Sequence, residues 1–272
     1  MWPSVLTNWV KFNRNLEGVL AWMYLDILGY VTTGMGNLID SVGAALALPW
    51  LNPDGSLASS AEVAAAWNAV DALRSDPKGQ RQTSGPATHY GQAFAGYTTI
   101  RLNAAGIQHA IATTIAADEP VLKHYYPKLD SWPADAQATV LSMAWAMGAS
   151  ANPFPGLFHK FNAACNAGDF KGAIQFADFK GTGVSMRIAQ NKLCLANAQV
   201  VVDQGLDPSA LYWPQQLKGV TPPPPPPPKP QPVLAPPPPS ALVALLGLSI
   251  IGATAYGVVR YASGKPMLPA FT

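Results

Sequence analysis

The sequence predicts an α+β fold that is mainly α, followed by a proline-rich linker and one transmembrane helix. Apolar residues recur at three- and four-residue intervals through much of residues 1–218, as expected for amphipathic helices. A single strand-like stretch at residues 21–25 runs into glycine-rich turns. Thirteen of the 27 prolines lie between Pro222 and Pro239, so the globular part must end before that run. We expect a domain at 1–218, a linker at 219–240, a membrane span at 241–259 and a short basic tail at 260–272.

Composition excludes some classes of function. The formal net charge is only +2, and no basic run could follow a phosphate backbone, so we expect no nucleic-acid binding. Cys165 and Cys194 have no CxxC partner, and we expect free buried thiols in preference to a disulfide. The histidines have no spacing suited to zinc, so we expect no metal and no cofactor.

The first elements form a helix and a hairpin. Apolar spacing predicts an amphipathic helix over residues 5–17, with Glu17 near its C-terminal end. The hairpin that follows would carry Asp26 on one arm and Thr32 on the other. Its turns contain Gly29, Gly34 and Gly36, which allow positive φ angles or a close approach of the backbone.

The middle and end of the domain are predicted to be helical. Residues 52–56 have turn chemistry, and Ser59 with Glu62 resembles a helix start. Residues 75–87 are predicted to be a loop. Further helices are expected at residues 103–117, 134–147, 157–167, 170–176 and 186–204. The helix at 134–147 is apolar on nearly every side and should lie at the centre of a helical lobe.

Several polar and aromatic residues have a simple structural interpretation. Asp130 and Asp135 bracket a helix start, so we expect both to cap it. Trp132, Trp145 and Trp213 could stack on sugar rings, but Trp145 fits a core position better. Trp213 is expected to cover the core at the end of the domain.

The C-terminal region predicts a tether. Residues 222–239 should form polyproline II and would span roughly 55 Å when extended. The segment from Ala241 to Val259 contains no charge and would form a helix of about 28 Å, close to the thickness of the hydrocarbon core. Arg260 and Lys265 follow it directly, which favours a cytoplasmic tail and an N-terminal domain outside. We see no removable signal peptide in the first residues.

Glu17, Asp26 and Thr32 are the residues best arranged for chemistry. Hydrolysis of a glycosidic bond needs an acid to protonate the leaving oxygen and a carboxylate that acts as nucleophile or activates water. A helix end and a hairpin can hold Glu17 and Asp26 on opposite sides of a substrate, while Thr32 orients the water. On spacing alone, two solvated carboxylates remain the simpler interpretation.

The order E-x8-D-x2-G-Y-x-T-x-G-x-G, from Glu17 to Gly36, resembles the active-site signature of the phage T4-type lysozymes, glycoside hydrolase family 24. Residues 135–148 resemble the central helix of that family's C-terminal lobe, and residues 161–173 resemble the helix pair that follows. The resemblance covers about 210 residues and implies a two-lobe lysozyme fold, with a small hairpin lobe, a helical lobe and a long helix between them.

The resemblance also implies roles for residues of this chain. Glu17 would be the general acid, Asp26 the second carboxylate and Thr32 the hydroxyl that holds the water. Tyr30 and Arg187 would contact the substrate, with Arg187 near the acid. The chain departs from the family at Asn37, where a histidine is common, and at Ala146, where a glutamine is common.

The expected function is therefore that of a membrane-anchored muramidase of a bacteriophage or prophage. It would cut the β-1,4 bond between N-acetylmuramic acid and N-acetylglucosamine, either as a lytic endolysin in the periplasm or as a virion enzyme. Its partners would be peptidoglycan strands, the bilayer through Ala241 to Val259, and other virion or membrane proteins. The alternatives are a virion or wall-binding protein that keeps the fold without catalysis, and a lytic transglycosylase.

Overall fold

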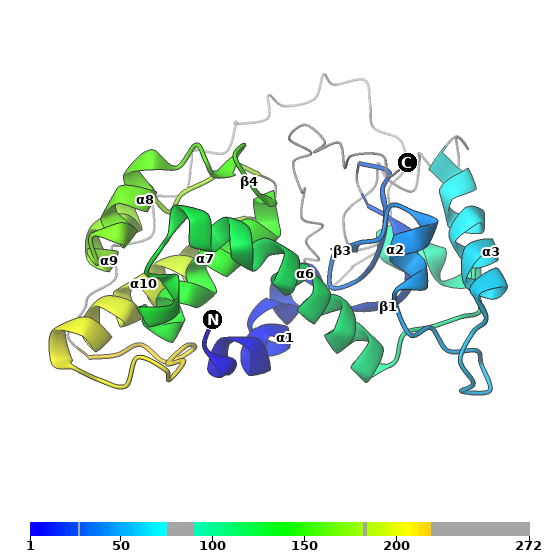
Figure 1. Ribbon diagram of the computed structural model, residues 1–272, viewed down its shortest axis with the longest axis horizontal. Helices are drawn as coiled ribbons and strands as arrows, with labels where there is room; N and C mark the ends of the chain where they lie inside the picture. The colour runs from blue at the N-terminus through cyan, green and yellow to red at the C-terminus, as the bar shows by residue number, and fades with distance from the viewer. Residues whose placement is uncertain (27, 75–89, 182–183, 219–272) are drawn as a thin grey trace, which may run out of the picture.

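The computed structural model describes residues 1–26, 28–74, 90–181 and 184–218, which form a mainly helical structure with two small sheets (Figure 1). The α-helices are α1 (Pro3–Glu17), α2 (Val42–Leu46), α3 (Ser60–Asp71), α5 (Tyr90–Ala93), α6 (Ala104–Tyr125), α7 (Ala134–Met147), α8 (His159–Asn166), α9 (Phe170–Ala173) and α10 (Ser185–Gln204). The 3-10 helices are η1 (Ala72–Arg74), η2 (Phe94–Gly96), η3 (Leu129–Ser131) and η4 (Ile174–Phe176). The strands are β1 (Leu20–Leu25), β2 (Val31–Gly34), β3 (Asn37–Leu38), β4 (Ala149–Ser150) and β5 (Phe154–Pro155).

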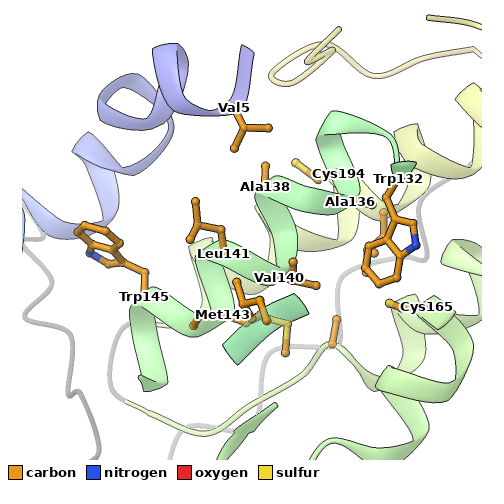
Figure 2. Close-up of a cluster of buried hydrophobic side chains, with 14 of the residues drawn as sticks. Val5, Trp132, Ala136, Ala138, Val140, Leu141, Met143, Trp145, Cys165 and Cys194 are labelled. Atoms are coloured by element: carbon orange, nitrogen blue, oxygen red, sulfur yellow. The ribbon is translucent and has the colours of Figure 1, made fainter. Parts of the chain in front are cut away.

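Helix α7 lies at the centre of the larger hydrophobic cluster, which we call the helical core. All 14 of its residues are buried, because other helices and the segments between them cover every side. Figure 2 shows its side chains pointing in several directions, toward Val5 of α1 as well as toward Cys165 and Cys194. Both thiols are free and buried, as predicted.

A second cluster, the sheet core, lies on the other side of α6 (Figure 1). Strands β1, β2 and β3 form an antiparallel sheet in that order, and apolar residues of the sheet, α3 and η2 pack together beneath it. Helix α6 joins the two clusters, since Ala110 belongs to the sheet core whereas Ile111 and Ile115 belong to the helical core. The prediction of a mainly helical α+β fold is confirmed.

Helix α6 is longer than predicted. The sequence prediction ended it at residue 117, but it continues through Pro120 to Tyr125. Proline removes one backbone donor from a helix and normally favours its end. Here the turn beyond Pro120 is stabilised by Leu122, which is fully buried in the helical core, and by the ion pair of Glu119 with Lys123.

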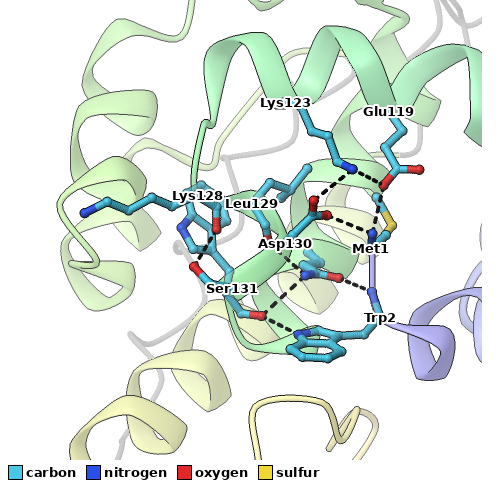
Figure 3. Close-up of polar contacts among 10 residues, drawn as sticks. Met1, Trp2, Glu119, Lys123, Lys128, Leu129, Asp130 and Ser131 are labelled. Atoms are coloured by element: carbon cyan, nitrogen blue, oxygen red, sulfur yellow. Dashed lines mark hydrogen bonds and ion pairs between the residues drawn. The ribbon is translucent and has the colours of Figure 1, made fainter.

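The prediction that Asp130 and Asp135 cap α7 is wrong. Asp130 lies in η3, and its carboxylate pairs with the Met1 amine at 2.9 Å and with Lys123 at 2.8 Å (Figure 3). Asp135 is fully buried and accepts hydrogen bonds from the backbone N–H groups of Tyr212 and Trp213, at 2.8 and 3.1 Å. Its carboxyl oxygens therefore hold the end of the domain on α7, because buried backbone donors need an acceptor.

Other sequence predictions can be compared directly. The helix at the N-terminus, the hairpin, the turn at residues 52–56 and the helix start at Ser59 are confirmed, and Ser59 and Glu62 form a capping box there. Trp213 lies against Phe12 with ring centroids 4.8 Å apart and packs on the helical core, as predicted. The loop at 75–87, the linker and the span from Ala241 to Val259 lie outside the described residues. Within residues 1–26, 28–74, 90–181 and 184–218, no helix is both long and apolar enough to cross a bilayer.

Burial of Asp135 generates a prediction about pH. Burial raises the pKa of Asp135 to about 6, above its value in an unfolded chain, despite the hydrogen bonds that it accepts. The folded state then binds the proton more tightly, so stability is full below about pH 4 and falls as pH rises toward 6, by on the order of 3 kcal/mol. In Asp135→Asn this fall in the free energy of unfolding with rising pH should disappear. Urea unfolding of a chain ending at Lys218, carried out at several pH values, measures it. The exposed Asp54→Asn control should keep the slope, and an unchanged slope in Asp135→Asn would contradict the assignment.

Candidate active site

Glu17 is the last residue of α1 and lies where the chain passes from the helical core to the sheet. The helix ends there because Gly18 adopts φ +68°, a conformation that other residues rarely take. The Glu17 side chain is only 3% exposed and forms an ion pair with Arg187, whose side chain is 2% exposed. A carboxylate buried this deeply requires such a partner, because desolvating an isolated charge costs several kcal/mol.

Arg187 lies in the first turn of α10 and is held on several sides. Its Nη1 donates to Asn13 Oδ1 at 3.1 Å, to Ser142 Oγ at 3.0 Å and to the Ser142 carbonyl at 3.2 Å. Burial lowers the pKa of the Arg187 guanidinium, and Glu17 opposes this effect. Three helices, α1, α7 and α10, therefore meet at one charged group.

The turn between β2 and β3, at Met35 and Gly36, lies close to Glu17. A β-carbon placed on Gly36 would lie 3.6 Å from Glu17 Oε2 and 3.8 Å from Trp145 Nε1. Trp145 Nε1 donates to the Met35 carbonyl at 3.0 Å, and Met35 itself is buried in the helical core. Gly36 adopts φ +83°, so the conformation of the turn beside the carboxylate favours glycine at this position. Trp145 is 1% exposed, which confirms it as a core residue.

Asn37 fixes this turn to α6. Its Oδ1 accepts from the Met35 N–H at 3.1 Å, and its Nδ2 donates to the Ala110 carbonyl at 3.0 Å and to Thr114 Oγ1 at 2.8 Å. The side chain is buried, and the bonds are neutral ones to the helix between the two cores. The residue that departs from the lysozyme signature thus connects the hairpin with α6.

Asp26 and Thr32 lie further along the hairpin. Asp26 Oδ1 accepts from the N–H groups of Leu28 and Tyr30 at 2.8 and 2.9 Å. Burial raises the pKa of the Asp26 carboxyl, while these two bonds lower it. Thr32 is 3% exposed, faces Tyr24 across the sheet, and donates its hydroxyl to the Tyr30 carbonyl at 3.1 Å.

The structure brings together part of the predicted set directly. Arg187 contacts Glu17, and the turn at Met35 and Gly36 lies beside Glu17 and Trp145, whereas Asp26, Tyr30 and Thr32 lie elsewhere on the hairpin. Trp132 is 5% exposed and packs edge-on against Phe170, so the suggestion that it stacks on sugars is wrong. No group of three or more metal-binding side chains occurs in the part of the chain that the structure describes.

Sequence reasoning missed the residues that hold this site. They are Asn13 and Ser142, which bind Arg187, and Arg74, whose guanidinium lies 5.8 Å from the centroid of the Tyr30 ring. Asn13 carried a usable signal, because it precedes Glu17 by one helical turn and so shares its helix face. Arg187, the partner of Ser142, and Asp40 and Tyr30, which Arg74 contacts, are distant in the sequence, and no local pattern indicates them.

No protein-family model matches the chain, and no curated protein matches it either. A functional interpretation must therefore be argued from the arrangement of the site and from the resemblance of its sequence signature.

The buried ion pair generates a prediction about stability. Arg187→Met would leave Glu17 buried without its guanidinium partner, so we expect a loss of about 3–5 kcal/mol in the free energy of unfolding. Replacing Glu17 by glutamine as well should recover part of this loss, because no buried charge then remains. Guanidinium denaturation of the single and double variants measures the effect.

Helix α10, which carries Arg187, also offers a control for this experiment. Lys192 pairs with Asp178, whose side chain is 58% exposed, so Lys192→Met should cost no more than about 1 kcal/mol. If Arg187→Met were no more costly than Lys192→Met, the ion pair would not be the constraint that its burial indicates.

A second prediction concerns the turn at Asn37. Asn37→Ala would remove the acceptor for the buried Met35 N–H and the donor to Thr114, which should cost about 2–3 kcal/mol. Asn52→Ala should cost less than about 1 kcal/mol, because the bond of the Asn52 side chain to Ser56 is exposed and water can replace it. Equal thermal shifts in the two variants would contradict this role.

Proposed function

We propose that the chain is a peptidoglycan hydrolase that cleaves the glycan strand as a lysozyme-type muramidase, with Glu17 as general acid. The observation that carries the proposal is the buried Glu17–Arg187 pair beside the glycine-rich turn of a hairpin that bears Asp26 and Thr32. A carboxylate fixed in this way between three helices and a hairpin is costly to maintain for stability alone. Its position at the junction of two cores favours a role in binding or chemistry.

The fold supports the same proposal. The helical core, the sheet core and the long helix α6 that contributes to both are compatible with the two-lobe lysozyme architecture. In that architecture the substrate strand would bind between the lobes, beside Glu17. The hairpin would then present Asp26 and Thr32 to the sugar from the sheet lobe.

Each residue would have a separate task. Glu17 would donate its proton to the glycosidic oxygen as the bond to the sugar breaks. Asp26, as a carboxylate, would activate water or act as nucleophile on the opposite face of the ring. Thr32 would accept a hydrogen bond from that water, since its own proton is directed to the Tyr30 carbonyl. Arg187 would stabilise the charge that Glu17 acquires when its proton leaves.

We also propose that the domain is attached to a membrane. The support is the uncharged segment from Ala241 to Val259 after a run of polyproline that can span roughly 55 Å. Such a spacer would let the domain reach the cell wall while the tail remains in the lipid. The host inner membrane and a virion membrane are both compatible with this arrangement.

The acid role predicts a kinetic result. In a chain ending at Lys218, Glu17→Gln should lower the rate of peptidoglycan solubilisation by about 10²–10⁴-fold, because general acid catalysis contributes that much. Asp26→Asn should also lower the rate strongly. The matched control is Glu62→Gln, an exposed glutamate of α3 whose replacement keeps a capping box and should leave the rate unchanged.

The products separate the alternatives. New reducing ends support a hydrolase, whereas 1,6-anhydro ends would show a lytic transglycosylase in which Asp26 does not act on water. Wall binding without any release of fragments, unchanged in Glu17→Gln, would favour a binding protein and overturn the proposal.

A further inference from the structure

The turn that carries Asp26 is held by its own backbone. The Asp26 N–H donates to the Tyr30 carbonyl and the Gly29 N–H donates to the Asp26 carbonyl, both at 2.9 Å. The bonds from Leu28 and Tyr30 both end on Oδ1 of the carboxylate.

Arg74, at the end of η1, packs against the side of that turn. Its guanidinium lies over the Tyr30 ring at 5.8 Å from the centroid, and a β-carbon on Gly29 would lie 3.8 Å from Arg74 Cγ. Nε donates to Asp71 Oδ1 at 2.6 Å, and both terminal nitrogens bind Asp40. The planar guanidinium is thus fixed by two carboxylates, as arginine geometry allows.

Asp40 connects the same group to the strand after the turn. Its Oδ1 accepts from the Val31 N–H at 3.0 Å, one residue beyond Tyr30. Arg74 therefore contacts the Asp26 turn directly through the Tyr30 ring, and indirectly through Asp40. Shifting the guanidinium would disturb the turn at the end formed by Tyr30 and Val31.

The charges at this place act on Asp26 in opposite directions. Among the described residues, the charged groups that act on it are Asp40, which follows β3, and Arg74, on η1, with Asp71 of α3 acting through Arg74. Burial is the largest influence and raises the pKa of Asp26, Asp40 raises it further, and Arg74 lowers it. The balance between Asp40 and Arg74 thus affects how readily Asp26 ionises.

We propose that Arg74 is a positioning residue for Asp26: it packs on Tyr30 and pairs with Asp40, and so holds the turn that carries Asp26 and offsets the negative charge of Asp40. The role of Asp26 as second carboxylate rests on the proposed function, but the coupling between the three side chains does not. Arg74 touches neither sugar nor water in this scheme. It acts by keeping Asp26 ionised and by fixing the orientation of its carboxylate when Glu17 donates its proton.

The test uses the full chain in detergent micelles and measures wall solubilisation against pH. Because the reaction needs ionised Asp26, Arg74→Gln should move the acidic limb of the pH–activity profile to higher pH. Activity on that limb should fall about tenfold relative to activity at the optimum. Asp40→Asn should move the limb to lower pH, and the double variant should lie close to the unmodified chain.

Arg101→Gln is the matched control. Arg101 lies over Trp22 of β1 at 5.5 Å and binds backbone carbonyls in the same lobe, but it is not among the charges that act on Asp26. Its replacement should leave the ratio of activities on the limb and at the optimum unchanged. If Arg74→Gln lowered activity by one factor at every pH, or had no effect, the proposal would be overturned.

A second readout does not need activity. Carbon-13 NMR of labelled aspartate can follow the ionisation of the Asp26 carboxyl in the full chain, with Asp26→Asn used to assign its signal. Its titration should move to higher pH in Arg74→Gln and to lower pH in Asp40→Asn. A chain without muralytic activity would refute the proposed function, while unmoved titrations would refute the role of Arg74.

Discussion

The burial of helix α7 on every side is the constraint on which the rest of the structure depends. A helix without a face for water must be surrounded, and its 14 buried residues are covered by α1, α6, α10 and the segments around α8 and α9. Covering it brings the end of α1 and the start of α10 to the same part of α7. Glu17 and Arg187, 170 residues apart, therefore meet beside Ser142.

The few polar residues of α7 determine which segments can cover it. Each needs a partner in the interior, because an unsatisfied buried polar group costs about 1–3 kcal/mol. Asp135 accepts hydrogen bonds from the backbone N–H groups of Tyr212 and Trp213. Gln137 donates to the Leu129 carbonyl, and Ser142 accepts from Arg187. A wholly apolar helix could pack against any apolar surface. These hydrogen bonds instead require particular neighbours at particular positions along α7.

Much of the fold could be predicted because its signals are local. Apolar periodicity indicated α1, a stretch that is apolar on nearly every side indicated α7, and glycines indicated the hairpin. The errors concern residues whose partners are remote: Asp135 looked like a cap, yet its partners lie 77 and 78 positions away. The role of Arg74 was missed for the same reason, because Asp40, with which it pairs, lies 34 positions away in the sequence. At the candidate site, resemblance suggested that Arg187 lies near the acid, but Asn13 and Ser142 came only from the coordinates.

The ion pair at Glu17 raises a physical question for an acid, because the pair favours the carboxylate and an acid must carry a proton. The other contacts of Arg187 address it. When Glu17 is protonated, the guanidinium still has Asn13 and both oxygens of Ser142 as acceptors, so it does not become an isolated buried charge. In the proposed reaction, Glu17 would become an anion whose charge Arg187 already faces. The prepositioned arginine would thus stabilise the anion that the proposed proton transfer leaves behind.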